Sequence, residues 1–465
     1  MKIDYRPEID GLRAIAVAAV IIYHAEILIQ GSQFFKGGYF GVDIFFVISG
    51  YLISSIIFRE LNETKTFSFK YFYERRIRRI IPVLIFVIIT SIPLAWFILS
   101  PIELVNFCKS ILYTLGFSSN LFFHFSGQEY AALSGLYKPF LHTWSLSVEE
   151  QYYAIFPIII LIIFKFYNNF LINFLFLIFF GSLILSEIGS TNFPSLNFYI
   201  LPTRMWEILV GTFIAHYETH NNYKKKLTKI NFVFPSIGLV LIFYSFLFFD
   251  NSLRHPSLYT TIPIIGVVLI ICFANNNEII YKILASKLFV GVGLISYSLY
   301  LWHYPIFAFA RITEITSGNL TFKILLGVLI LFLSIFSYIF IEKKFRDKKN
   351  NFRNILILIT TFLFLIFFFC FYVISKNGVE NRMPKYLQNV TYNETHKLLK
   401  NSENIECLQN KDGCVFNPNS NKKVFLVGDS HAASIGFDLK NNLIKKNYKL
   451  ITSLMGDCGF FPDFD

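Results

Sequence analysis

The chain has 465 residues, of which 54% are apolar and 56 are phenylalanine, and its mean hydropathy is +0.53. This composition excludes an ordinary soluble domain and is typical of a polytopic membrane protein. The formal net charge is +12 at pH 7, but the basic residues gather in alternate loops between apolar runs. Membrane topology therefore accounts for the charge, and we expect no nucleic-acid partner.

Eleven apolar runs are long enough to cross a bilayer. They lie near residues 11–29, 38–58, 80–99, 145–164, 170–187, 199–217, 230–249, 258–274, 285–309, 321–341 and 353–375. A weaker run at 104–123 is interrupted by Lys109 and by the stretch 116–120, so we interpret it as interfacial or re-entrant. Lys and Arg are in excess in the loops after the second, sixth and tenth runs. This excess predicts a cytoplasmic N-terminus and a C-terminal tail outside the cytoplasm.

The first apolar run carries Arg13 and His24, eleven residues apart. At about 100° per residue both side chains share one helix face, roughly 16 Å apart along the axis. Ionisable residues within a span usually face a protein interior or a watery cavity. The pair therefore predicts a track for a long anionic donor, with its phosphates at Arg13 and its reactive end at His24. The alternative is an arginine that reaches the interface and a histidine satisfied inside the bundle.

Other runs carry polar residues to a depth similar to that of His24, which predicts a shared polar cavity. These residues are Asp43, His142, Glu149, Glu150, Arg204, Glu207, Trp302 and His303. Five of them are candidates to line the cavity that holds the acceptor: His142, Arg204, Glu207, Trp302 and His303. We expect His24 to be the base, oriented by Asp43, Glu149 or Glu150, because a carboxylate stabilises an imidazolium. Arg204 is expected to pair with Glu207 or to bind substrate. The alternative is a set of buried ion pairs that hold the helices together.

The segment 73–82, YERRIRRIIP, places Arg75, Arg76, Arg78 and Arg79 at the cytoplasmic mouth of the third run. Guanidinium groups bind phosphate in a bidentate manner, so this cluster is a candidate site for a polyanionic donor. The alternative is a plain topological anchor. Nothing in the Cys and His spacing predicts a metal site.

The sequence changes character near residue 376, where Phe-rich runs give way to Asn, Lys and Glu. We interpret 376–421 as a polar linker outside the cytoplasm. A short buried strand at 422–428, a helix near 432–446 and a strand near 448–453 predict the beginning of an α/β domain over 422–465. Cys407 and Cys414 are close enough to close a small disulfide loop, which leaves Cys458 unpaired.

Five stretches resemble the acyltransferase 3 family of membrane acyltransferases, in its form fused to an SGNH hydrolase-like domain. They are 9–24 (IDGLRAIAVAAVIIYH), 37–54 (GGYFGVDIFFVISGYLIS), 73–82, 142–153 (HTWSLSVEEQYY) and 296–305 (SYSLYLWHYP). The resemblance implies a membrane domain at 1–345, followed by one further transmembrane helix at 346–375. It also implies that Arg13 and His24 form the family's Arg-x10-His motif and that the stretch 75–79 matters for activity.

The same resemblance implies an inner-membrane enzyme that transfers acetyl from cytoplasmic acetyl-CoA. The bias toward Ile, Lys, Asn and Phe indicates a bacterial source, and no metal is expected. The acceptor would be a hydroxyl of a cell-envelope glycan, often lipopolysaccharide O-antigen. The competing interpretations are a transporter of acyl groups or lipid-linked glycan, and an inactive remnant. A transporter should show repeat symmetry, which the sequence lacks.

The segment 428–434, GDSHAAS, resembles the first conserved block of SGNH enzymes, with Ser430 as the candidate nucleophile. A serine at a strand-to-helix turn is exposed and backed by a helix N-terminus, which suits that role. The family's Asp and His partners lie far downstream, whereas this sequence ends 35 residues after Ser430. We therefore expect a truncated SGNH-like domain.

Overall fold

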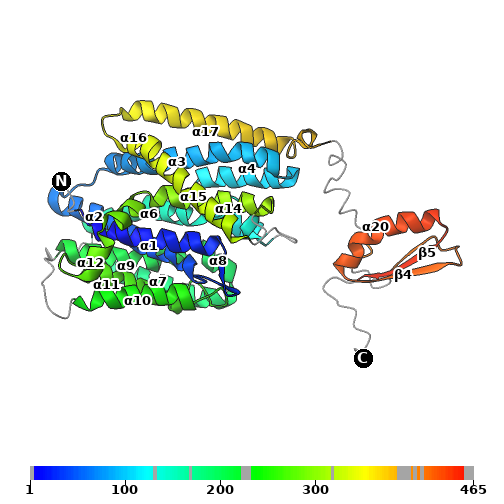
Figure 1. Cartoon of the computed structure of the whole chain (residues 1–465), viewed down its shortest axis with the longest axis horizontal. Helices are drawn as coiled ribbons and strands as arrows, with labels where there is room; N and C mark the ends of the chain where they lie inside the picture. Colours follow the sequence, from blue (N-terminus) through cyan, green and yellow to red (C-terminus); the bar gives the residue numbers. More distant parts are fainter. Residues whose placement is uncertain are drawn as a thin grey trace. The chain divides into compact units, whose positions relative to one another are not determined.

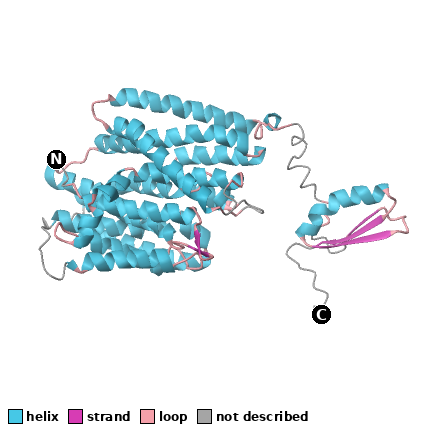
Figure 2. Ribbon diagram, viewed as in Figure 1, coloured by secondary structure: helices cyan, strands magenta, loops and turns pink. Residues whose placement is uncertain are grey.

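The computed structural model describes residues 5–128, 134–166, 170–220, 232–315, 319–384, 399–401, 406–408 and 413–454. The chain divides into two compact units, Met1–Gly378 and Val379–Asp465. Figure 2 shows that the first unit is built almost entirely from helices, whereas the second combines a helix with a small sheet. The predicted helical architecture is thus confirmed.

Long apolar helices joined by short connections dominate the first unit. The helices are α1 (Pro7–His24), α2 (Gly41–Thr64), α3 (Phe69–Ile98), α4 (Pro101–Leu115), α5 (Ser119–Ser126), α6 (Thr143–Phe166), α7 (Leu171–Asn192), α8 (Pro194–Tyr199), α9 (Leu201–His220), α10 (Phe234–Phe248), α11 (Thr261–Phe273), α12 (Ile279–Leu284), α13 (Lys287–Leu294), α14 (Ser296–Ile312), α15 (Leu320–Ser337), α16 (Lys343–Arg346) and α17 (Phe352–Ser375). A two-residue hairpin, β1 (Leu28–Ile29) with β2 (Ser32–Gln33), follows α1.

Within the described residues, six helical segments are long and apolar enough to cross a membrane. They are Gly38–Thr64, Phe69–Ile98, Thr143–Phe166, Leu171–Asn192, Leu320–Arg346 and Phe352–Ser375. Helices α1, α9, α10, α11 and α14 coincide with the other predicted spans, but they are shorter or carry more charged residues. Several apolar helices therefore fit a multi-pass membrane protein.

Two predicted runs are broken in the structure. The run near 285–309 is two helices, α13 and α14, which meet at Ile295. The weaker run at 104–123 is also two helices, α4 and α5, and the break between them coincides with its glycine-containing stretch. Helix α4 begins with a capping box in which Ser100 and Glu103 satisfy each other's backbone N–H groups.

Helix α1 lies in the middle of the bundle in Figure 1 and packs against α2, α13 and α14. Helices α2 and α9 pack in close backbone contact at Gly50 and Gly211, where a Cβ atom would collide with the facing backbone. Such close approach requires glycine. It brings the polar residues of α2 and α9 together in the buried interior.

The second unit contains a three-stranded sheet of order β3-β5-β4, with strands β3 (Cys414–Phe416), β4 (Lys423–Gly428) and β5 (Lys449–Leu454). Strands β4 and β5 are parallel and are connected through α20 (Ser430–Lys445), whereas β3 pairs with β5 in antiparallel fashion. The predicted strand, helix and strand are therefore confirmed. The sequence analysis missed β3, whose three residues are too few for a periodic pattern.

Residues from the predicted polar linker contribute to the core of this second unit. Leu399, Cys407, Cys414 and Phe416 are buried there with residues of the sheet and α20. The predicted disulfide between Cys407 and Cys414 is present and joins two cysteines that are seven residues apart in the sequence. Cys458 lies outside the described residues.

Candidate active site

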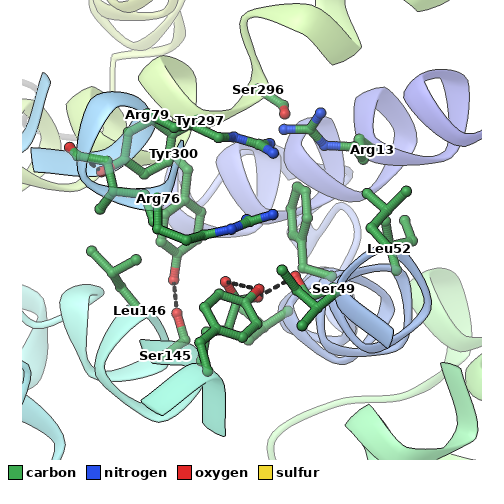
Figure 3. Close-up of a pocket in the computed structure, with 17 residues that line it drawn as sticks. Arg13, Ser49, Leu52, Arg76, Arg79, Ser145, Leu146, Ser296, Tyr297 and Tyr300 are labelled. Carbon is green, nitrogen blue, oxygen red and sulfur yellow. Dashed lines mark hydrogen bonds between the residues drawn. The ribbon is translucent and has the colours of Figure 1, made fainter. Parts of the chain in front are cut away.

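A pocket of about 90 Å³ lies beside Arg13 of α1. Its basic residues are Arg13, Arg76 and Arg79, and we call it the arginine pocket. Figure 3 shows the three guanidinium groups directed into one space from α1 and α3. Arg13 also forms an ion pair with Asp10, at 3.2 Å between Nη1 and Oδ1. Three cations around one space form a site for a polyanion.

The four clustered arginines of α3 do not share one role. Arg76 and Arg79 line the arginine pocket, whereas Arg75 is exposed on the helix. Arg78 is buried and donates to the carbonyls of Phe345, Asp347 and Asn350, so it ties α3 to the turn after α16. Of the four arginines of α3 that were predicted to bind the donor, Arg76 and Arg79 share a pocket with Arg13.

Glu149 lines the arginine pocket, not the space around His24. Its Oε1 accepts a hydrogen bond from the Ser49 hydroxyl at 2.9 Å. The neighbouring Glu150 has an Oε1 atom that lacks a hydrogen-bond partner among the described residues. Arg76 lies over the Tyr153 ring, with 5.3 Å from Cζ to the ring centroid.

A larger pocket of about 680 Å³ lies at the His24 end of α1. It contains three imidazoles, His24, His142 and His255, and we call it the histidine pocket. Its other walls are aromatic and polar side chains, including Tyr23, Tyr39, Trp144, Phe198, Tyr199, Tyr304, Ser134, Ser190, Ser195, Asn251, Ser252 and Arg254. A volume in this range suits a ligand larger than an acetyl group.

His24 is oriented by the backbone of its own helix. Its Nδ1 donates to the Val20 carbonyl at 2.9 Å, which leaves Nε2 as the unprotonated nitrogen. Arg311 holds the end of α1 by donating to the His24 carbonyl, and its Nε pairs with Glu26 Oε2 at 3.0 Å. Among the described residues no carboxylate hydrogen-bonds His24. The prediction that Asp43, Glu149 or Glu150 orients His24 is therefore wrong, because a backbone carbonyl takes that position.

His303 and His142 complete a cluster of imidazoles around His24. The ring centroid of His303 lies 5.2 Å from that of His24 and 5.4 Å from that of His142. His303 donates from Nδ1 to the Tyr300 carbonyl at 2.6 Å. Within the described part of the chain, neither ring nitrogen of His142 nor Nε2 of His303 has a hydrogen-bond partner, although both rings are buried.

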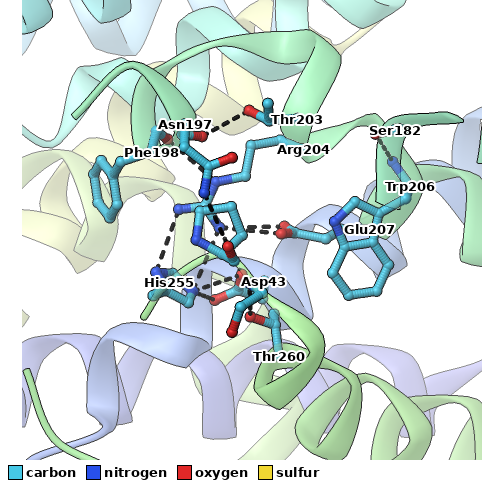
Figure 4. Close-up of polar contacts among 12 residues, drawn as sticks. Asp43, Ser182, Asn197, Phe198, Thr203, Arg204, Trp206, Glu207, His255 and Thr260 are labelled. Atoms are coloured by element: carbon cyan, nitrogen blue, oxygen red, sulfur yellow. Dashed lines mark hydrogen bonds and ion pairs between the residues drawn. The ribbon is translucent and has the colours of Figure 1, made fainter. Parts of the chain in front are cut away.

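Asp43, Arg204 and Glu207 form a buried ion-pair network together with His255 (Figure 4). Nη1 of Arg204 lies 2.8 Å from Asp43 Oδ1 and 3.1 Å from Glu207 Oε1, and these three side chains are 0% exposed. The predicted pairing of Arg204 with Glu207 is confirmed. Arg204 and Glu207 are absent from the walls of both pockets, and their place in an acceptor cavity stays a prediction.

His255 connects this network to the histidine pocket and was missed by the sequence analysis. It lies in the connection after α10, where no helical periodicity marks it. Its Nε2 is 3.1 Å from Asp43 Oδ1. Burial lowers the pKa of the His255 imidazole, and the Asp43 carboxylate acts in the opposite direction.

Trp302 also lies away from both pockets, because its Nε1 donates to the Ser337 hydroxyl at 2.8 Å and joins α14 to α15. Its place in an acceptor cavity likewise stays a prediction. His303 sits behind the pocket wall, beside His24 and His142. No cluster of three or more potential metal ligands occurs in the described ranges.

Ser430 begins α20 directly after β4, as predicted for a serine at a strand-to-helix turn. Gly428 has φ of +153°, a conformation that favours glycine. The side chain of Ser430 lies outside what the structure describes. Its proposed chemistry therefore stays a prediction.

Residues 6–342 match the acyltransferase domain family. The peptidoglycan O-acetyltransferase OatA of Listeria monocytogenes is 32% identical over 363 residues, which cover 75% of this chain and 57% of that protein. The O-acetyltransferase OatA of Staphylococcus aureus is 30% identical over 355 residues, covering 74% of this chain and 58% of that protein. The chain thus spans little more than half the length of these two relatives. No solved structure matches it significantly. The sequence match and the helical architecture together show that the chain belongs to the acyltransferase 3 family.

Proposed function

We propose that the chain is a membrane O-acetyltransferase that moves acetyl from acetyl-CoA to a hydroxyl of a cell-envelope glycan. One observation carries the proposal: Arg13 and His24, on one helix, line two pockets that share Val42 and Tyr300 in their walls. A donor that binds through its phosphates in the first pocket has its reactive end directed toward the second. A long CoA-type donor fits this arrangement better than a compact one.

The arginine pocket is the proposed donor site. Arg13, Arg76 and Arg79 offer forked N–H donors that match phosphate oxygens in a bidentate manner. Arg75 and Arg78, which the sequence analysis grouped with them, are assigned no contact with the donor. The Glu149 carboxyl group lines the same pocket, and we propose that it limits the pocket's net positive charge and orients the three guanidinium groups.

His24 is the proposed base. Because Nδ1 donates to the Val20 carbonyl, Nε2 is free to take the proton of the acceptor hydroxyl as its oxygen attacks the acetyl carbonyl carbon. The C–O bond forms, the C–S bond of the thioester breaks, and the sulfur leaves with the proton returned through His24. An N–H of His142 is available to stabilise the oxyanion that develops in between, since both its ring nitrogens lack protein partners in the described residues.

The histidine pocket is the proposed acceptor site. Its aromatic walls suit the apolar faces of a sugar, and its serine and asparagine groups suit sugar hydroxyls. The Listeria relative is named for peptidoglycan, so we favour a cell-wall glycan over lipopolysaccharide O-antigen as the acceptor. The membrane lipid itself is the third partner, along the exposed apolar faces of helices such as α15 and α17.

We infer a topology of eleven spans in a bacterial plasma membrane, with the N-terminus in the cytoplasm. The domain at 1–345 would carry the acetyl donor and acceptor pockets, and 346–375 would add one span. The segment 376–421 would then follow outside the cytoplasm, and 422–465 would begin an SGNH-like domain with Ser430 as its nucleophile. A reporter that fluoresces only in the cytoplasm, fused after residue 465, should stay dark. A bright fusion would contradict the eleven spans.

Transfer can be tested in sealed membrane vesicles that contain the full chain, radiolabelled acetyl-CoA and a soluble cell-wall glycan fragment. We expect label in the glycan with the wild-type chain and none with His24→Ala at equal abundance. His303→Asn, at a histidine behind the pocket wall, serves as the matched variant and should retain part of the activity. Label transfer that does not depend on His24 would contradict the assignment.

A further inference from the structure

Three tyrosines on one face of α14 follow the line from one pocket to the other. Tyr297, Tyr300 and Tyr304 are three and four residues apart, which places them on the same side of a helix. Tyr297 lines only the arginine pocket, Tyr304 lines only the histidine pocket, and Tyr300 lines both. Tyr300 is therefore at the boundary between the two spaces.

Each of these hydroxyls donates to a backbone carbonyl of a different segment. Tyr297 donates to Ile80 of α3 at 2.9 Å, and Tyr304 donates to Gly135 at 2.8 Å. The two outer tyrosines thus hold α14 against the walls of their own pockets. Substitutions of Tyr297 and Tyr304 can therefore serve as controls for a substitution of Tyr300.

The hydroxyl of Tyr300 contacts the N-terminal turn of α6 at two points. It donates to the His142 carbonyl at 2.9 Å and lies 2.6 Å from the Ser145 hydroxyl, the pair drawn with a dashed line in Figure 3. His142 lines only the histidine pocket and Ser145 lines only the arginine pocket. The two hydrogen bonds of Tyr300 therefore tether it to the walls of both pockets. Val42 of α2 is the other residue that lines both pockets.

The arginine pocket is much the smaller of the two spaces. Its volume of about 90 Å³ is well below the roughly 300–1,000 Å³ of typical ligand pockets, whereas the histidine pocket at about 680 Å³ falls inside that range. An acyl thioester arm that extends from the arginine pocket to His24 must pass between α2 and α14. The side chains that meet it there are Val42 and Tyr300.

We propose that Tyr300, held by Ser145 and opposed by Val42, is the specificity-determining residue that limits the size of the acyl group passed from donor to acceptor. The inference rests on the proposed function, because it assumes that the acyl group crosses between the pockets. The phenol ring narrows the passage, and the hydrogen bonds to α6 keep the ring in place. An acetyl group passes it, and a longer acyl chain is hindered.

The test compares acyl donors of different length in the vesicle assay, using acetyl-CoA and hexanoyl-CoA. Tyr300→Leu removes the ring and its tether, and Val42→Ala widens the same passage from the opposite helix. We expect either change to raise the ratio of hexanoyl to acetyl transfer by roughly tenfold or more, the scale on which apolar pockets discriminate chain length. Tyr297→Leu and Tyr304→Leu, each at one pocket only, should leave the ratio as in the wild type.

The inference would be overturned if Tyr300→Leu or Val42→Ala, produced as a folded protein, gave the same ratio of hexanoyl to acetyl transfer as the wild type. An equal rise in Tyr297→Leu or Tyr304→Leu would also overturn it, since general loosening of α14 would then explain the effect. Failure of the proposed function looks different, because the wild-type chain would then transfer neither acyl group. Ser145→Ala adds an independent check: it removes one tether and should raise the ratio by less than Tyr300→Leu.

Discussion

Two polar clusters border the histidine pocket, and they differ in how well their polar atoms are satisfied. The first cluster is the network of Asp43, Arg204, Glu207 and His255. Each of its ionisable groups has an ion-pair partner within 3.1 Å. In the cluster of His24, His142 and His303, ring nitrogens are left without protein partners among the described residues. Buried polar groups in native proteins are nearly always paired. The comparison assigns the first cluster to holding helices together, and the His24 and His142 imidazoles of the second to meeting a ligand.

The energetic cost of disturbing each cluster follows from that difference. Removal of one member of a buried ion pair leaves an uncompensated charge, which costs about 3–5 kcal/mol. Removal of an unpartnered imidazole leaves no charge behind and breaks few contacts. The network should therefore control stability, and the imidazole cluster should control transfer.

The largest effect on transfer is expected for His24→Ala. Loss of a general base typically costs 10²- to 10⁴-fold in rate, so we expect at least roughly a hundredfold loss of acetyl transfer. The abundance of the folded protein should stay near that of the wild type, because His24 is at the end of α1 and Arg311 binds its carbonyl, not its ring. Transfer rate per folded molecule is the measurement. A well-folded variant with most of its activity would remove His24 from the mechanism.

Arg204→Met should have its main effect on stability. It leaves Asp43 and Glu207 as buried carboxylates without their shared cation, so we expect a loss of ~3–5 kcal/mol and much lower folded yield. Arg254→Met is the matched control: Arg254 lines the histidine pocket beside His255 of the network, is half exposed and lies 3.8 Å from Glu187. That change should cost less than about 1 kcal/mol. Detergent-solubilised protein followed by thermal unfolding separates the two, and equal stability would contradict a structural role for the network.

The sequence was informative about which residues share a helix face. Arg13 and His24 could be placed on one stripe of α1 because helical geometry alone fixes that relation. Apolar periodicity likewise located the long helices, and the strand, helix and strand of the second unit. These features depend on residues close together in the chain.

Contacts between distant segments could not be predicted in the same way. Depth along a span suggested that Asp43, Glu149 and His24 share one cavity, but the rotation of each helix separates them into different sites. His255 reaches Asp43 from a connection 212 residues away, where no pattern marks it. The imidazole of His24 uses a carbonyl of its own helix, a partner that side-chain composition does not reveal.

Arg79→Ala should weaken donor binding with less effect on the maximal rate. Arg79 lines the arginine pocket, and a charge-assisted hydrogen bond contributes about 1.5–3 kcal/mol, so KM for acetyl-CoA should rise roughly tenfold or more. Arg79→Lys should recover only part of this loss, because a point charge replaces a planar fork. The dependence of the initial rate on acetyl-CoA concentration is the measurement. An unchanged KM in both variants would move the donor away from this pocket.

Arg75→Ala should have the smallest effect of the series. Arg75 belongs to the same basic run as Arg79, and a purely topological or diffuse electrostatic role would make the two equivalent. The structure instead exposes Arg75 on the helix while Arg79 faces the pocket. Because both variants lose one positive charge from the same region of α3, their comparison separates direct contact with the donor from diffuse electrostatic attraction.

We expect KM within about twofold of the wild type for Arg75→Ala, since exposed charges near a site contribute at most about 1 kcal/mol and are screened by salt. If Arg75→Ala raised KM as much as Arg79→Ala, and added salt abolished both effects, the arginines would act as a surface field and the pocket lined by Arg13, Arg76 and Arg79 would lose its claim to the donor phosphates.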